Sequence, residues 1–290
     1  MPLDFYLNAA TGGLLTGLVY GLSALGLSVI FGVIRIVNFA HGEIMVLGMF
    51  ATLLIFRHLG IDPLASLPIV AAGLFGFGFL LQDMVVRRVA HLADHMQFLL
   101  MAAIAVVLIS LCLMLFGPDA QGLQVDYAYE SFAIGPLLVD KVRVYAGLAA
   151  LTVAGLLFAF FRYAPTGKAI RACGDNPVGA QVVGLNLRRL YALTFGIGTA
   201  CLGAAGAIML LLVDVHPYLG PSYTLLAFII VIIGGMGSLP GALLGGILIG
   251  VSEAVAGLIL QPSLKSAFSF GLLILVLLLR PQGLLGKAVR

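Results

Sequence analysis

The segment from Val215 to Ser252 contains 38 residues without a single Asp, Glu, Lys or Arg. About 20 apolar residues are enough to cross a bilayer as a helix, and a run this long cannot stay exposed on a monomeric water-soluble domain. Five other stretches of 18 or more residues are equally free of these charges. The chain is therefore expected to be an all-α polytopic membrane protein, and its function must take place in or across a bilayer.

Glycines recur along this run and just beyond it at helical spacing. Small residues spaced in this way let two membrane helices approach closely. The pattern predicts a packing face, either within the chain or against a partner subunit. Its members are Gly237, Gly241, Gly245, Gly246, Gly250 and Gly257.

Composition narrows the possible partners. Charged residues make up only 9% of the chain and the formal net charge is +3, whereas a soluble protein carries about 25% charged residues. Most of the positive charges lie between apolar runs, which favours membrane orientation and does not favour nucleic-acid binding. The first 34 residues carry one charge, Asp4, so the first apolar run is expected to be a retained span and no cleaved signal peptide is expected.

The charge-free runs predict between eight and ten transmembrane or re-entrant helices, with nine as the direct count. The 38-residue run must break at Gly234–Gly241, because proline and glycine disfavour helix there. The spans at Ile44–Phe56, Tyr223–Ile233 and Ser266–Leu279 are short, so one of them could be re-entrant. The predicted spans lie near Ala9–Ile30, Ile44–Phe56, Pro63–Leu81, Met96–Phe116, Val144–Phe161, Leu190–Val213, Tyr223–Ile233, Gly241–Leu260 and Ser266–Leu279.

The distribution of Lys and Arg predicts the orientation. Basic residues gather in the loop 162–189, in the C-terminal tail and at Arg87 and Arg88, whereas the loop between Gly117 and Arg143 holds four acidic residues. The positive-inside rule places the three basic segments in the cytoplasm and the mixed loop outside. Nine spans then put the N-terminus outside, and a re-entrant Ile44–Phe56 puts it inside.

The basic loop contains the pattern of a short bounded helix. Asp175 or Asn176 can cap its N-terminus, Pro177 suits the first helical position, and Gly184 suits a left-handed C-terminal stop. About two turns of helix are not stable alone. The segment is expected either to dock against a partner or to lie on the membrane surface.

Polar residues occur at two places inside or beside the apolar runs. The block Asn38–Glu43, which includes His41, is either a hydrated interfacial loop or the break in a broken helix, with Asn38 capping the second half. In the second interpretation the block lines a translocation path or gate.

Glu253 is an ionisable residue within a predicted span, and it shares a helical face with Gly246, Gly250 and Gly257. Because a carboxylate facing lipid is costly, Glu253 should face the bundle or a wet cavity. It is expected either to hold two helices together by a hydrogen bond or to contact a transported substrate.

Four sequence blocks resemble the branched-chain amino-acid permeases of the LivH/LivM type, and among them the LivH-like members. The blocks are Gly21–Glu43, Arg171–Phe195, Gly234–Gly246 and Leu277–Gly286, and they follow the family order along nearly the whole chain. The Ala180-x-x-x-Gly184 step resembles the coupling loop of ABC-importer permeases. The commonest form of that loop has Glu-Ala where this chain has Val178-Gly179.

The resemblance implies a single transmembrane permease domain over residues 1–290, with a cytoplasmic coupling loop at about 162–189. It further implies residence in the inner membrane, a related second permease of the LivM type, two cytoplasmic ATPases and a periplasmic or lipid-anchored binding protein. ATP and Mg would be held by the ATPases, since the chain has no GxxxxGK[ST] motif. The coupling residues would be Asp175, Asn176, Pro177, Ala180 and Gly184.

Other functions are compatible with parts of the pattern. A permease of the same fold could import urea, short amides or small carboxylates. An ion-coupled carrier acting alone would use Glu253 and need no ATPase. A membrane metalloenzyme would use His41, Glu43, His91 and His95 as ligands. A capped cytoplasmic helix argues against the last two functions, because neither needs a docking element there.

Overall fold

The structure is a computed structural model that describes residues 3–90, 92–134, 137–259 and 265–286. It is a bundle of helices with one small antiparallel pair of strands, in which Ser131 lies opposite Asp140. The elements are α1 (Leu3–Ile34), α2 (His41–Leu59), α3 (Pro63–Leu81), η1 (Gln82–Val86), α4 (Arg87–Val89), α5 (Asp94–Phe116), η2 (Asp126–Tyr129), β1 (Ser131–Ile134), β2 (Leu137–Asp140), α6 (Lys141–Tyr163), α7 (Pro165–Asp175), α8 (Pro177–Val182), α9 (Leu187–Met209), η3 (Pro217–Leu219), α10 (Gly220–Gly234), α11 (Leu239–Ile259) and α12 (Lys265–Leu279).

Eight helices within the described residues are long and apolar enough to cross a membrane, and Ala267–Leu279 forms a shorter apolar helix. The fold class predicted from the charge-free runs is therefore confirmed. The 38-residue run breaks where predicted, because α10 ends at Gly234 and α11 begins at Leu239. The predicted span at Ile44–Phe56 was too short, since α2 begins at His41 and ends at Leu59.

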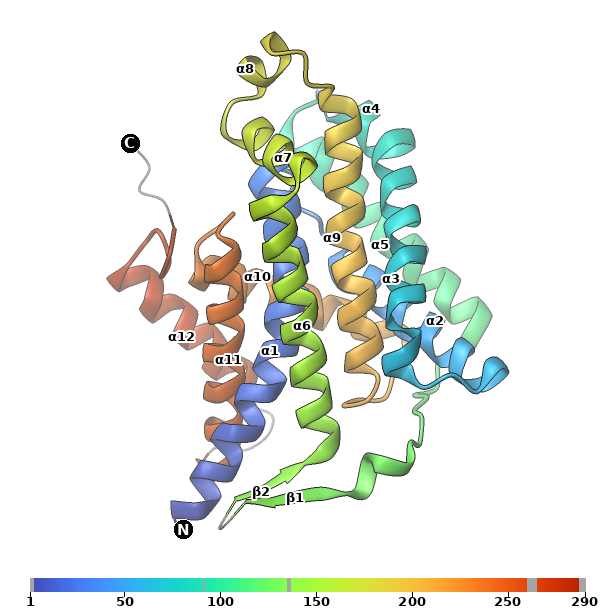
Figure 1. Cartoon of the computed structure of the whole chain (residues 1–290), viewed down its shortest axis with the longest axis vertical. Helices are drawn as coiled ribbons and strands as arrows, with labels where there is room; N and C mark the ends of the chain where they lie inside the picture. Colours follow the sequence, from blue (N-terminus) through green and yellow to red (C-terminus); the bar gives the residue numbers. More distant parts are fainter. Residues whose placement is uncertain (1–2, 91, 135–136, 260–264, 287–290) are drawn as a thin grey trace.

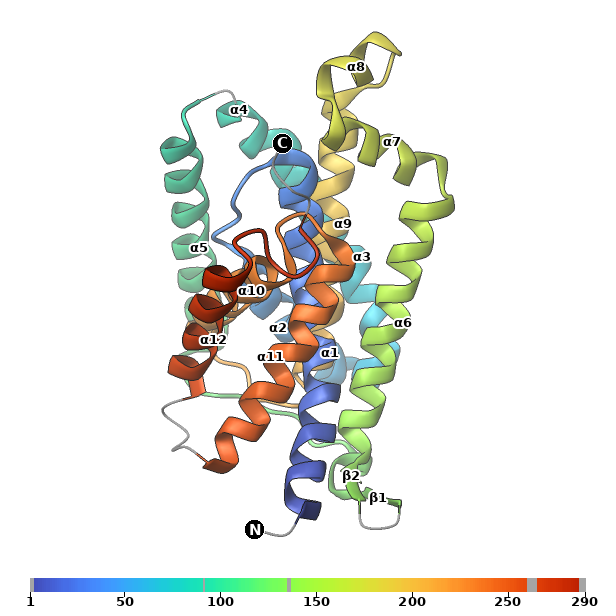
Figure 2. The ribbon, with the colours of Figure 1, turned by 90° about the vertical axis from the view of Figure 1, so that its left-hand side faces the viewer.

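The two ends of the bundle differ in structure (Figures 1 and 2). The N-terminus lies at the end that carries β1 and β2, here called the hairpin end, where the side-chain oxygen of Asn8 accepts a hydrogen bond from the Leu138 N–H at 2.9 Å. Helices α7 and α8 lie at the opposite end, here called the α7–α8 end. Within the described residues, the eight candidate spans and the shorter helix together match the direct count of nine, and the N-terminus lies at the end opposite the basic loop.

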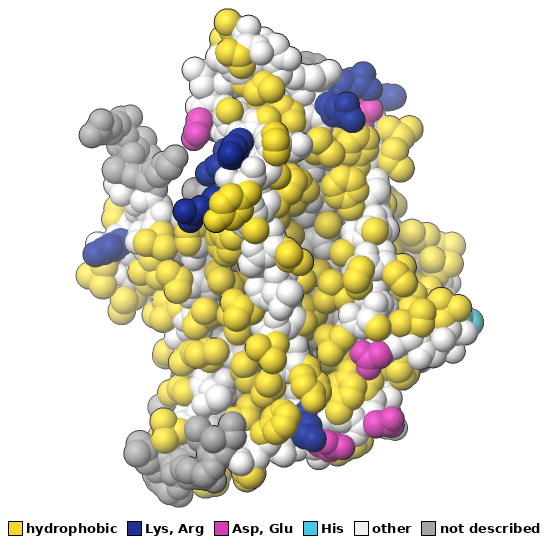
Figure 3. Space-filling model, in the orientation of Figure 1, with side chains coloured by type: hydrophobic (Ala, Val, Ile, Leu, Met, Phe, Trp, Pro, Cys, Tyr) yellow, Lys and Arg dark blue, Asp and Glu magenta, His cyan; other side chains and the backbone are white. Residues whose placement is uncertain are grey.

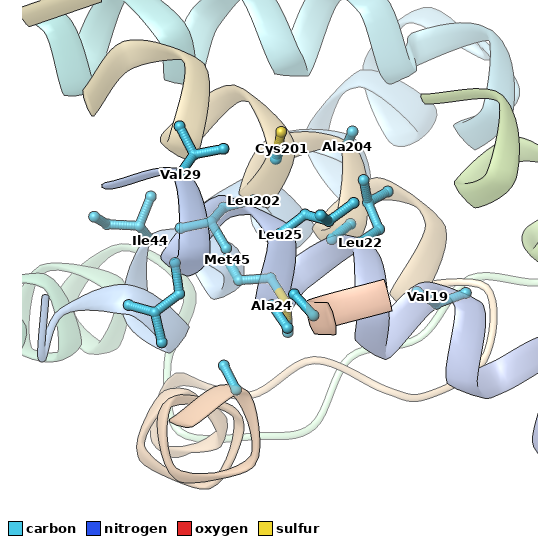
Figure 4. Packing of buried hydrophobic residues seen from close by; sticks show 14 of the residues in the cluster. Val19, Leu22, Ala24, Leu25, Val29, Ile44, Met45, Cys201, Leu202 and Ala204 are labelled. Carbon is cyan, nitrogen blue, oxygen red and sulfur yellow. The ribbon is translucent and has the colours of Figure 1, made fainter. Parts of the chain in front are cut away.

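Helices α1 and α9 form the centre of the bundle. Buried side chains of α1, α2 and α9 meet there, as Figure 4 shows for Leu22, Met45 and Cys201. At one point α1 and α9 touch through glycines, because a Cβ atom on Gly26 would lie 2.6 Å from the carbonyl oxygen of Gly198. Two backbones can come this close only where the residues in contact have no side chain.

Two three-helix segments of the bundle, α1–α2–α3 and α9–α10–α11, have similar packing but opposite direction. Helix α1 packs most extensively on α11, and α9 packs most extensively on α3. Each central helix is followed by a non-helical break and then by a helix that starts inside the bundle, α2 after α1 and α10 after α9. The segments α1–α2–α3 and α9–α10–α11 run in opposite directions through the bundle (Figures 1 and 2). This inverted-repeat arrangement is known from transporters and places the two breaks beside each other.

Candidate functional site

The N-termini of α2 and α10 meet in the interior of the bundle. Gly42 donates its backbone N–H to Thr224 Oγ1 at 2.8 Å, and Thr224 Oγ1 donates to Glu43 Oε2 at 3.2 Å. The backbones touch as well, because a Cβ atom on Gly220 would lie 2.9 Å from the Glu43 N atom. One hydroxyl group therefore joins two half-helices and anchors a buried carboxylate between them. We call Gly42, Glu43, Gly220 and Thr224 the half-helix junction.

The residues before α2 are buried too. Asn38 and His41 are fully buried, which agrees with a broken helix and excludes a hydrated interfacial loop in this conformation. Ser23 Oγ of α1 lies 3.4 Å from His41 Nε2. The predicted cap at Asn38 was wrong by two residues: Ala40 occupies the N-cap position, and Asn38 Oδ1 accepts from the Ala40 N–H at 3.0 Å. The side chain fixes the turn that leads into the helix.

A small cavity adjoins this region on the α1 side. Its walls include Tyr20, Ser23, Met45 and Tyr223, and its volume is about 10 Å³. A cavity needs roughly 10–15 Å³ to hold one water molecule. An amino acid does not fit in this cavity.

Most glycines of the long run pack against other helices of this chain. Gly246 and Gly250 contact the glycines of α1, with a Cβ atom on Gly250 reaching 2.4 Å from the Gly13 carbonyl oxygen. Gly241 and Gly245 contact α10, and Gly237 contacts Gly32 of α1. Of the two predicted packing faces, these contacts correspond to the one within the chain. Gly257 is half-buried on α11.

Glu253 lies on α11 next to α12. Its Oε1 accepts a hydrogen bond from Ser269 Oγ at 2.7 Å, and Ser269 is buried. This geometry corresponds to the helix-to-helix hydrogen bond that the sequence predicts as one of two roles. Contact between Glu253 and a substrate stays a prediction.

Helix α8 has the caps that its sequence predicts. Asn176 Oδ1 accepts from the Gly179 N–H at 2.9 Å, and Pro177 begins the helix. Gly184 has φ +85°, and the Leu185 N–H returns to the Ala180 carbonyl at 3.0 Å. Of the two candidate caps, Asp175 instead ends α7. The loop 162–189 is thus two helices joined by a bend at Asn176.

Sequence reasoning missed the valines of this segment. Val178, Val182 and Val183 are 71%, 82% and 75% exposed, while Ala180 is buried. Helix α8 projects beyond the rest of the bundle (Figures 1 and 2). Three exposed apolar side chains on a projecting helix mark a surface that another protein can cover. On α7, burial raises the pKa of the Cys173 thiol, so this cysteine stays protonated at neutral pH.

A second missed feature ties α9 to α3. Arg188, in the first turn of α9, donates two hydrogen bonds to Asp83, from Nε at 2.7 Å and from Nη2 at 2.8 Å. Asp83 lies in η1, a π-helical segment that continues α3. Segments of this kind often mark functional sites. The bidentate pair connects the helix that follows α8 directly to α3.

The part of the chain that the structure describes contains no cluster of residues suited to a metal site. No three His, Cys, Asp or Glu residues there lie close enough to hold a metal ion. His41 and Glu43 are buried at the start of α2, and His95 is exposed at the start of α5. His91 lies outside the described residues.

Known proteins are similar to this sequence over most of its length. The family model described as branched-chain amino acid transport system / permease component matches residues 9–277. The high-affinity branched-chain amino acid transport system permease protein LivH of Salmonella typhimurium is 32% identical, over 98% of this chain and 96% of that protein. The corresponding figures for the permease protein BraD of Pseudomonas aeruginosa are 28%, 97% and 96%. The permease protein LivM of Escherichia coli is 26% identical, over 92% of this chain and 68% of that protein.

Proposed function

The chain belongs to the branched-chain amino acid transport system permease component family, and from this premise we propose that it is one permease of an ATP-driven importer for branched-chain or related apolar amino acids. It forms the translocation path with a second, LivM-like permease in the inner membrane. Two ATPase subunits bind ATP and Mg on the cytoplasmic side, and a binding protein delivers the substrate on the other side. The similar permeases LivH, BraD and LivM are named as parts of branched-chain amino acid transport systems, which supports this substrate class.

The observation that carries the proposal is α8. It is a capped helix that projects from the basic end of a membrane bundle and exposes Val178 and Val182. A six-residue helix cannot hold its shape alone, so its caps and its buried Ala180 fix the surface that an ATPase would cover. Motion of that surface reaches α9 through the short connection after Gly184, and reaches α3 through Arg188 and Asp83.

The half-helix junction is the proposed gate. Asn38, His41 and Glu43 stand where two broken helices meet, and the adjoining cavity is too small for an amino acid. In this proposal α2 and α10 move apart to let substrate pass. Hydrogen bonds through a single hydroxyl group, Thr224 Oγ1, hold them together in the closed state.

Docking can be tested by co-purification of the complete transporter. The variants Val178→Asp and Val182→Asp are expected to insert normally but to lose the ATPase subunits, because each places a charge in an apolar contact. Tyr129→Asp is the matched control, since Tyr129 is 85% exposed at the opposite end of the bundle. Retention of ATPase by both valine variants would refute the assignment of α8.

Uptake into proteoliposomes tests the substrate and the energy source. The complete transporter should take up leucine only with ATP, and isoleucine and valine should compete while urea does not. Uptake by this chain alone under an ion gradient would instead identify an ion-coupled carrier.

A further inference from the structure

Two adjoining cavities lie at the α7–α8 end, over the C-terminal part of α1. Their volumes are about 1170 Å³ and 420 Å³, and they share Gly32, Phe161, Arg171 and Gly237 among their lining residues. The walls come from the ends of α6 and α11, from α7 and from the segment between α10 and α11. We call this space the basic groove.

Positive charge surrounds the basic groove. Arg35, Arg162 and Arg171 line the larger cavity, and Lys168 joins Arg171 in the smaller one. Asp175 is the one acidic residue among the lining residues. Within the described chain none of the four basic residues forms an ion pair with a carboxylate, in contrast to Arg87, Arg143 and Arg188. Figure 3 shows Lys and Arg side chains gathered over α7.

The basic groove also has apolar walls and one buried polar group without a partner. Phe31, Phe158 and Phe161 line it. Ser28 is only 1% exposed, lines the smaller cavity, and its Oγ has no hydrogen-bond partner. Because buried hydroxyl groups normally have a partner, this hydroxyl is available to a bound molecule. The basic groove thus combines basic side chains, aromatic walls and a buried hydrogen-bonding group.

We propose that the basic groove binds the phosphate headgroup of an anionic phospholipid. The arginines and Lys168 would hold the phosphate, since arginine binds phosphate oxygens with paired N–H groups. The glycerol and upper acyl carbons would lie along Phe31, Phe158 and Phe161, within reach of Ser28. Basic pockets between transmembrane helices at the cytoplasmic side are known to take such headgroups.

The location favours a lipid over a soluble phosphate. The basic groove lies between the ends of two membrane-spanning helices, α6 and α11, at the end that the positive-inside rule assigns to the cytoplasm. A lipid of that leaflet reaches it sideways, and the aromatic walls give its acyl chains a contact that inorganic phosphate lacks. Arg35, held at φ 61° where a non-glycine residue is uncommon, lines the larger cavity.

Native mass spectrometry of the complete transporter in detergent tests the proposal, with short-chain phosphatidylglycerol as the probe. Lys168→Gln/Arg171→Gln should weaken binding by roughly thirtyfold, because each basic side chain near an anionic surface contributes a factor of roughly five. Arg87→Gln/Arg88→Gln removes the same charge at the same end outside the basic groove and should leave binding within about twofold. Ser28→Ala should weaken it by a smaller factor.

Two further measurements distinguish a lipid headgroup from free inorganic phosphate as the bound group. Phosphatidylcholine should bind far more weakly than phosphatidylglycerol, and millimolar inorganic phosphate should not displace the lipid. Equal binding by the Lys168/Arg171 variant and the Arg87/Arg88 control would overturn the proposal. Displacement by inorganic phosphate would overturn the lipid assignment. Because the readout is lipid binding and not uptake, the result is independent of the transported substrate.

Discussion

Gly42 lies so close to Gly220 that a Cβ atom on Gly42 would stand 1.9 Å from the Gly220 carbonyl oxygen. Gly42→Ala should therefore push the half-helix junction apart and lower the unfolding free energy by about 1–3 kcal/mol. Thermal unfolding of the purified transporter measures this. Gly73→Ala is the control, because a Cβ atom there meets nothing within 4 Å and alanine stabilises a helix by roughly 0.5–1 kcal/mol relative to glycine. Equal stability of the two variants would contradict the packing described here.

Thr224→Val keeps the shape of the side chain but removes the hydroxyl that serves both Gly42 and Glu43. The Gly42 N–H loses its acceptor, which costs about 1–3 kcal/mol for a buried group. If the half-helix junction is the gate, leucine uptake should also fall. Thr152→Val is the matched control, since the Thr152 hydroxyl binds the Leu148 carbonyl of its own helix on an exposed face. Normal uptake and stability in Thr224→Val would argue against a role for this hydroxyl.

Gly250→Val should prevent α11 from packing on α1, because its Cβ atom would lie 2.4 Å from the Gly17 Cα atom. The expected result is loss of the folded protein from the membrane fraction, measured by fluorescence-detected size-exclusion chromatography. Gly271→Val on α12 makes the same change in open space and should fold normally. A well-folded Gly250→Val protein would mean that the α1–α11 contact tolerates separation.

Asp83→Arg and Arg188→Asp should each reduce ATP-driven uptake while the ATPases stay bound, because the pair connects α9 to α3 but lies apart from the valines of α8. The double variant that exchanges the two charges should recover much of the uptake. The decisive comparison is between the single variants and the exchange. Uptake that stays low in the exchange variant, with assembly intact, would indicate that the two residues act separately.

Glu253→Gln retains an oxygen that can accept from Ser269 but removes the charge. If Glu253 serves to join α11 and α12, ATP-driven uptake and thermal stability should change little, whereas Glu253→Leu should lower stability. A strong loss of uptake in Glu253→Gln alone would favour a role of the charge in transport.

Short-range chemistry explains why several features could be predicted. The caps of α8 depend on Asn176, Pro177 and Gly184, which lie within nine residues of one another. The break after Gly234 depends on neighbouring glycines and a proline. The half-helix junction could not be found in this way, because Thr224 lies 182 positions from Gly42 and nothing in either local sequence marks the other.

The sequence by itself determined that this chain spans a membrane, where its helices break and which end is basic, because charge-free length, glycine and proline act locally. Only the tertiary structure decided which surfaces meet. It turned the glycines of the long run towards α1 and α10 of the same chain and joined Arg188 to Asp83. It also gathered Arg35, Arg162, Lys168 and Arg171 around one groove. Those pairings follow from the inverted packing of distant helices, a property of the folded bundle that no local sequence pattern encodes.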